Sequence, residues 1–184
     1  DLRGAPRACT ASDRDAERGT PGPPGAFQQP AEGGETRHPA PSDLHMDTEW
    51  PTDDVIGPFK GEYSYLSNFS DIGFEVWGNR FPTAEHAYQA GKAIGQPDWF
   101  EKIRDADSLK EAKTLGYEVD LPAEWDRIKD RCMVEIVTAK VGQNPDVQTR
   151  LVETAPTPIV MLNSWDDTYW GADEDTGEGR NKLG

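Results

Sequence analysis

Large apolar side chains are almost absent from the first quarter of the chain, which limits where a folded core can form. The first 45 residues include seven prolines and six glycines, and their only large apolar residues are Leu2, Phe27 and Leu44. Such a segment buries too little surface to offset the entropy lost on ordering it. We therefore predict a disordered tail over residues 1–54 and one folded domain over residues 55–184, long enough for a real core.

The start of the chain also suggests a leader. The first residue is Asp1, and the first methionine is Met46. Because the preceding residues are rich in Arg, Ala, Gly and Pro, we expect them to be a flexible leader or translated upstream sequence, with Met46 as the natural start. A peptide spanning Met46 in native material would contradict this expectation.

Charge and cysteine content exclude several classes of function. The formal net charge is −15, and residues 57–184 carry 23 acidic and 14 basic side chains. This balance argues against binding along a nucleic-acid backbone, which needs a basic face, but allows action on one modified nucleotide. Two cysteines, Cys9 and Cys132, make neither a disulfide framework nor a zinc site. Without a long apolar run or a signal peptide, we expect a cytoplasmic protein with no membrane partner.

Local patterns predict an α+β fold: a helix-dominated single domain with a small antiparallel sheet. Thr83 and Ser108 are typical helix N-caps, and Glu111 would complete a capping box with Ser108. Predicted helices cover residues 83–93, 99–104, 108–116, 122–141 (closed by Gly142) and 146–153. Predicted strands lie near Phe59, in a hairpin over residues 74–81 with a turn at Gly78-Asn79, and at residues 159–162.

Three polar residues share one face of the helix that begins after Thr83. Glu85, Gln89 and Lys92 stand at positions i, i+4 and i+7 of an otherwise Ala-rich segment. One interpretation is a solvated ladder of polar side chains. The other is a carboxylate beside a cleft, with an amine nearby. The helix dipole favours the Glu85 anion, so a general acid at this position would require burial.

The C-terminal segment 165–171 contains two Trp, one Tyr and two Asp, a mixture that suits a ligand pocket. Aromatic faces stack on flat bases, and carboxylates bind ribose hydroxyls or stabilise a cation. The alternative is a turn with Asp caps and core aromatics. The spacing of the acids over residues 166–175 does not match a calcium-binding loop, so we predict no metal site.

Weaker signals complete the list of candidate residues. The Gly-rich segment 177–184 offers Arg180 and Lys182 as phosphate ligands, although the dinucleotide-binding fingerprint and the P-loop motif are both absent. Cys132 is expected in the core. His86 points away from Glu85 and is expected to pack or cap, which leaves no basis for a Ser–His–Asp triad.

The order of five sequence blocks resembles the NADAR family, also called YbiA-like. The resemblance spans about residues 58–184, and the blocks are residues 66–69 (LSNF), 82–92 (PTAEHAYQAGK), Trp125 with Lys129 and Met133, 167–171 (DTYWG) and 179–184 (GRNKLG). It implies a helix-rich α+β fold and hydrolysis of N-glycosidic bonds, without cofactor or metal. Activities in that family include cleavage of early riboflavin-pathway intermediates. They also include removal of ADP-ribose from guanine, as antitoxin to a DNA ADP-ribosyltransferase.

The resemblance also implies roles for individual residues. Glu85, Lys92 and Asp167 match the family's catalytic positions: Glu85 would handle a proton or activate water, Asp167 would orient the ribose or stabilise the cation, and Lys92 would hold phosphate or act as a Schiff-base amine. The residues expected to bind substrate are Asn68, Trp125, Trp170, Gly171, Arg180, Asn181 and Lys182.

Two departures from the family pattern stand out. Gly91 replaces a larger residue and is expected to widen the pocket. The chain stops at Gly184, where relatives continue with a Leu-Met-rich helix.

The hypothesis at this point is an N-glycosidase acting on ADP-ribosylated guanine, in a nucleotide or in DNA, or on a related ribose-phosphate N-glycoside. A riboflavin-type intermediate is the alternative substrate. A non-catalytic module that binds ADP-ribose or NAD is the competing class. A third interpretation is an interaction partner, such as an inhibitor of a cognate ADP-ribosyltransferase toxin.

Overall fold

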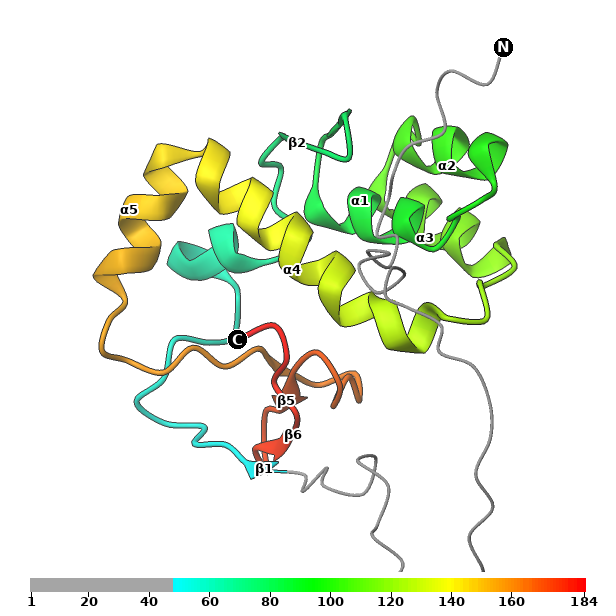
Figure 1. Cartoon of the computed structure of the whole chain (residues 1–184). Coiled ribbons are helices and arrows are strands. Elements are labelled where there is room, and N and C mark those ends of the chain that lie inside the picture. Colours follow the sequence, from blue (N-terminus) through cyan, green and yellow to red (C-terminus); the bar gives the residue numbers. More distant parts are fainter. Residues whose placement is uncertain (1–47) are drawn as a thin grey trace, which may run out of the picture. The chain divides into compact units, whose positions relative to one another are not determined.

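The computed structural model describes residues 48–184, where five α-helices, one 3₁₀ helix and two small sheets form a mixed α+β domain (Figure 1). The predicted fold class, a helix-dominated domain with a small antiparallel sheet, is thereby confirmed. The predicted tail up to residue 47, with Cys9 and Met46, lies outside the described residues. The helices are η2 (Gly61–Leu66), α1 (Ala84–Gly91), α2 (Pro97–Arg104), α3 (Leu109–Glu118), α4 (Trp125–Gln143) and α5 (Pro145–Glu153).

The larger sheet joins the two ends of the described chain. Its strands are β1 (Thr48–Glu49), β6 (Glu178–Gly179), β5 (Ala172–Asp173) and β4 (Leu162–Asn163), in that order across the sheet. The β1–β6 and β5–β6 pairs are antiparallel, whereas β4 and β5 run parallel. The Trp50 indole N–H donates to the Gly179 carbonyl at 3.0 Å. Residues 48 and 49, which the sequence placed in the tail, thus form a strand of the sheet, and Trp50 is hydrogen-bonded to it.

A short hairpin forms the second sheet, as the sequence predicted. Strand β2 (Phe74–Val76) pairs antiparallel with β3 (Asn79–Phe81). The turn residues are Trp77 and Gly78, with φ of 53° and 71°, one position earlier than predicted. Positive φ at both central residues is the geometry that matches the twist of a two-residue hairpin.

The main core lies where α1 packs on its neighbouring helices and on the hairpin. Helix α1 contacts α2, α3, α4 and β3, while α4 covers β2. Figure 1 shows α4 running between the α1–α3 group and the segment that carries β5 and β6. Among the side chains with 2% exposure or less are Phe74, Phe81, Phe100, Ile103, Cys132 and Ile136. Cys132 therefore has the core position that was predicted for it. No helix within residues 48–184 is long and apolar enough to cross a bilayer.

Three local predictions were wrong or displaced. No strand forms near Phe59: Pro58 lacks an N–H, the Lys60 N–H turns back to the Pro58 carbonyl at 2.7 Å, and Gly61 has φ of 57° before η2 begins. The strand predicted at 159–162 is reduced to an isolated bridge between Ile56 and Ile159, followed by β4.

Helix α4 passes through Gly142, which was predicted to close it, and ends at Gln143. The next residue, Asn144, precedes Pro145, and a residue before proline disfavours the helical conformation.

Candidate functional site

The first turn of α1 is fixed by its cap and by a loop from earlier in the chain. The Thr83 hydroxyl accepts from the His86 N–H at 3.2 Å, as predicted for this N-cap. The Glu85 N–H donates to the Asn68 carbonyl at 2.9 Å. Two otherwise orphaned donors of the helix end are thus satisfied, and the Glu85 backbone is tied to the loop that carries Asn68. The His86 side chain is buried, with its Nδ1 2.8 Å from the Thr83 hydroxyl, which agrees with the packing alternative expected for it.

The polar stripe of α1 is buried. Glu85 is 7% exposed and Gln89 is 4% exposed, which excludes the solvated-ladder interpretation for these two residues. The Gln89 amide donates to one Glu85 carboxylate oxygen at 2.8 Å. Gly116 in α3 lies directly against this pair, because a Cβ built there would come within 2.0 Å of the Gln89 Oε1. Any larger residue at position 116 would therefore force the Gln89 side chain to move.

Lys92, one residue beyond α1, lies among aromatic rings. Its ammonium is 5.7 Å from the centroid of the Tyr88 ring and 5.3 Å from that of Tyr117. Burial lowers the pKa of Lys92; the nearby Glu85 opposes this change and Lys113 adds to it. A lysine with a lowered pKa is the kind that can act as an amine nucleophile near neutral pH.

The loop that carries Asp167 is organised by the buried Asn163 at the end of β4. The Asn163 amide donates to the carbonyls of Asp167 and Ala172 at 3.0 and 3.1 Å, and its oxygen accepts from the Asp167 N–H at 3.0 Å. One Asp167 carboxylate oxygen accepts from the Trp170 N–H at 2.9 Å. The carboxylate orientation is thus set by its own loop.

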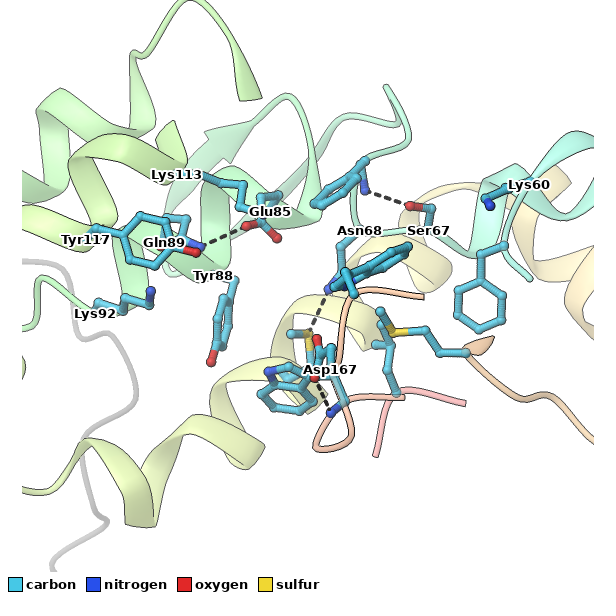
Figure 2. Close-up of a pocket in the computed structure, with 17 residues that line it drawn as sticks. Lys60, Ser67, Asn68, Glu85, Tyr88, Gln89, Lys92, Lys113, Tyr117 and Asp167 are labelled. Atoms are coloured by element: carbon cyan, nitrogen blue, oxygen red, sulfur yellow. Dashed lines mark hydrogen bonds between the residues drawn. The ribbon is translucent and has the colours of Figure 1, made fainter. Parts of the chain in front are cut away.

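Helix α1 and the loop that carries Asp167 face one cavity of about 420 Å³. Figure 2 shows Glu85 with Gln89 and Lys113 on one side of the pocket, Asp167 on another, and Asn68 between them. Among the described residues, the second oxygen of each carboxylate has no hydrogen-bond partner, so it remains available to a ligand. The cavity is lined by Phe59, Lys60, Ser67, Asn68, Phe69, Glu85, Tyr88, Gln89, Lys92, Lys113, Tyr117, Met133, Met161, Trp165, Asp167, Trp170 and Leu183.

The charge and aromatic content of the cavity differ from those of the chain as a whole. Three lysines, Lys60, Lys92 and Lys113, line it against two carboxylates, although the chain carries −15. None of the three forms an ion pair with another described residue. The well-exposed aromatic side chains, Phe69 and Trp165 together with Tyr117, also line this cavity. Such walls suit an anionic ligand that carries a flat ring.

The structure brings five of the ten predicted site residues to this cavity. They are Asn68, Glu85, Lys92, Asp167 and Trp170.

Three of the other predicted residues do not line this cavity. Trp125 is buried against Tyr88, with ring centroids 5.5 Å apart, and lines an adjoining hollow of about 430 Å³. Gly171 packs against the Met161 carbonyl, where no Cβ would fit. Asn181 accepts from the Met161 N–H and donates to the Ile159 carbonyl, at 2.9 Å each.

Arg180 and Lys182, the predicted basic ligands, also lie outside the cavity, and Gly91 does not have the effect expected of it. Arg180 lies over the Tyr169 ring, and Lys182 pairs with Asp130 at 3.1 Å. Gly91 does not line the cavity; it faces the Trp77 ring, with Trp125 beyond, so it opens space for packing and does not widen the pocket.

Sequence inspection missed Lys60, Lys113 and Asn163. The two lysines have no local signal, because a lysine in an acidic chain normally lies in solvent. Asn163 follows an apolar run and was an ordinary turn residue by type. Within residues 48–184 no group of three or more His, Cys, Asp or Glu could hold a metal ion. Asp173 caps a local turn by accepting from Thr176.

Fold and site together define a small-ligand pocket between an α1 carboxylate and a C-terminal acidic loop. Residues 56–184 match the NADAR domain, and the chain belongs to the NADAR family. It is 34% identical over 125 residues to "N-glycosidase YbiA" of Shigella flexneri serotype 5b (strain 8401), covering 67% of this chain and 76% of that protein.

Two further comparisons agree with this assignment. The NMR structure of the Escherichia coli protein YbiA superposes with a TM-score of 0.62 at 30% identity, covering 71% of this chain and 79% of that chain. A riboflavin biosynthesis protein of Vibrio vulnificus (strain YJ016) is 32% identical over 124 residues, or 66% of this chain and 33% of that longer protein. These similarities support an N-glycosidase.

Proposed function

We propose that this protein hydrolyses the N-glycosidic bond between a ribose phosphate and a base. The observation that carries the proposal is the shared cavity: Glu85 from α1 and Asp167 from the C-terminal loop line it together with three lysines. Carboxylates suit the sugar, lysines suit phosphate, and exposed aromatic rings suit a base. The relatives named N-glycosidase support the reaction type.

The two carboxylates have complementary roles in the proposed reaction. Breaking the C–N bond gives the sugar carbon oxocarbenium character and leaves a basic nitrogen, which must be protonated while water supplies the new C–O bond. Glu85, held by Gln89 through one oxygen, handles the proton or activates the water with the other. Asp167 orients the ribose hydroxyls or stabilises the developing positive charge.

Lys92 has two roles open to it. As an ammonium it would bind the substrate phosphate. As a neutral amine it would attack C1 of the ring-opened sugar; the C1–N bond to the base would then break, with a proton delivered to the departing base nitrogen, and water would hydrolyse the resulting imine to the sugar aldehyde and free Lys92. Burial favours the neutral amine, because it lowers the pKa of Lys92. Lys60 and Lys113 supply cations for phosphate in that case.

Borohydride trapping distinguishes the two roles. Reduction during turnover should attach the sugar to Lys92, and Lys92→Arg should abolish both trapping and activity if the imine forms. Because arginine keeps the charge, substantial activity in that variant would favour the phosphate role.

Two substrate classes follow from this chemistry. ADP-ribosylated guanine, free or in DNA, and a phosphorylated ribosylamino intermediate of riboflavin synthesis both contain a ribose phosphate joined to a base through nitrogen. The cavity of about 420 Å³ lies in the lower part of the roughly 300–1,000 Å³ range of ligand sites. It fits one base with its sugar phosphate, so an ADP-ribosyl substrate must extend outside it.

The deciding experiment assays both substrates side by side with matched variants. Glu85→Gln and Asp167→Asn should each lower kcat at least ~100-fold, the usual scale for an acid–base or charge-stabilising group. Asp166→Asn is the matched control, because Asp166 is the adjacent acid, is exposed and does not line the cavity. Full activity of folded Glu85→Gln would reject the mechanism. Tight binding of either compound without product would indicate a binding module.

A further inference from the structure

Lys140 in α4 is a buried lysine without a counter-ion. It is 3% exposed, and among the described residues it forms no ion pair. Its ammonium donates to the neutral Ser67 carbonyl at 2.8 Å. An ammonium loses its hydration on burial, and a hydrogen bond to a neutral carbonyl offsets only part of that cost. Stability alone therefore does not explain a lysine at this position.

The Ser67 carbonyl does not depend on Lys140 for a partner. It also accepts from the Ser70 hydroxyl at 2.8 Å and from the Ser70 N–H at 3.2 Å. These two bonds stay within the loop, whereas the bond from Lys140 joins the loop to α4. Loss of the lysine would thus leave no unpaired carbonyl, but it would remove this link between loop and helix.

A second bond links the same loop to the same face of α4. The Asn68 amide nitrogen lies 3.6 Å from the sulfur of Met133, a weak acceptor (Figure 2). Met133 and Lys140 are seven residues apart, so they share one face of the helix. The Asn68 carbonyl in turn accepts from the Glu85 N–H at 2.9 Å. Residues 67 and 68 therefore connect one face of α4 to the first turn of α1.

We infer that Lys140 is a positioning residue, which holds residues 67 and 68 so that Glu85 and the Asn68 side chain keep their places in the cavity. Lys140 does not line that cavity, whereas Ser67 and Asn68 both do. Its effect therefore passes through the loop. The inference rests on the proposed function, in which Glu85 handles the proton or activates the water. A misplacement of about 1 Å at such a group can lower the rate about 100-fold.

Three variants separate positioning from folding. Lys140→Met nearly keeps the length of the side chain and removes the donor, and its apolar tip suits neighbours such as Val137 and Val141. Lys140→Arg keeps a donor, and an adjoining apolar cavity of about 200 Å³ gives the longer side chain room. Ile136→Val is the matched control, because Ile136 is buried in α4 and does not line the cavity that contains Glu85.

Two measurements are made on each protein. Amide hydrogen exchange followed by NMR reports on the Glu85 N–H, and steady-state kinetics with a ribose phosphate N-glycoside gives kcat and KM separately. Lys140→Met should resist urea at pH 7 at least as well as wild type, because it buries no charge. Its Glu85 amide should exchange at least about tenfold faster, and kcat should fall about 10–100-fold with little change in KM. Lys140→Arg and Ile136→Val should retain wild-type exchange at Glu85 and most of kcat.

Several outcomes would overturn the inference. Unchanged Glu85 exchange in Lys140→Met is one, whether or not kcat falls, because Lys140 would then not act through this loop. Equal changes in Ile136→Val are another, since they would indicate a general loosening of α4. Should Lys140→Met not fold, Lys140→Leu, which also lacks a donor, is measured in its place. A wild type that cleaves no ribose phosphate N-glycoside would count against the proposed function, while the exchange result would still decide whether Lys140 positions Glu85.

Discussion

Gly116→Ala tests whether Gln89 fixes Glu85. The new Cβ would lie 2.0 Å from Gln89 Oε1 and 2.8 Å from its Cδ, so the Gln89 side chain must move. Displacement breaks its hydrogen bond to the Glu85 carboxylate, a charged bond worth roughly 1.5–3 kcal/mol. In a helix interior, alanine is more favourable than glycine by about 1 kcal/mol. The expected net destabilisation is about 0.5–2 kcal/mol.

A double-mutant cycle separates the clash from helix propensity. In a Gln89→Ala background only the Cβ of residue 89 stays close to the new methyl group, at 3.0 Å, so Gly116→Ala should be neutral or stabilise the protein by up to about 1 kcal/mol. The coupling free energy between positions 89 and 116 is then about 0.5–3 kcal/mol. Urea denaturation of the four proteins measures it, and kcat should fall in Gly116→Ala because Glu85 loses its support. Equal destabilisation by Gly116→Ala in both backgrounds would refute the close contact.

Two further predictions concern buried groups outside the cavity. Asn163→Ala leaves the Asp167 and Ala172 carbonyls without their donor, so the free energy of unfolding should fall by about 2–4 kcal/mol. The value of kcat should fall as well, because Asp167 loses its support. An active variant with an unchanged Tm would show that the Asp167 loop does not need Asn163. Lys140 donates to the Ser67 carbonyl at 2.8 Å, and burial lowers its pKa from 10.5 to about 8. Between pH 8 and 10.5 the Lys140 amine keeps its proton in the unfolded state and has lost it in the folded state. The free energy of unfolding of the wild type therefore rises by on the order of 3 kcal/mol across this range. Lys140→Met should lack this gain in urea titrations at pH 7 and 9.5, and parallel pH profiles of the two proteins would contradict it.

Sequence was sufficient where structure depends on a few neighbouring residues. Thr83 and Ser108 cap their helices as predicted, because a side-chain oxygen needs only the N–H two or three residues ahead. The expected capping box is displaced by one residue, since Glu111 accepts from the Asp107 N–H. The hairpin at Gly78 also follows from local turn chemistry.

The site could be predicted only in part, because its geometry comes from packing between distant segments. The polar face of α1 marked Glu85, but its burial depends on α3 and on the loop that carries Asn68. The basic C-terminal residues were plausible phosphate ligands by composition. The register of β5 and β6 directs Lys182 instead to Asp130 on α4. The lysines that do line the cavity, Lys60 and Lys113, come from segments without any motif.

Charge explains how an acidic protein can hold an anionic ligand. A chain of net charge −15 repels phosphate at long range, and ions screen such repulsion beyond roughly 10 Å at 0.1 M salt. Inside the cavity Lys60, Lys92 and Lys113 outnumber the two carboxylates, and low-dielectric walls strengthen their local field. The ligand is thus selected at short range, by a few lysines and rings that a single modified nucleotide can reach. An extended polyanion gains little from that local field, because most of its phosphates remain against the acidic exterior.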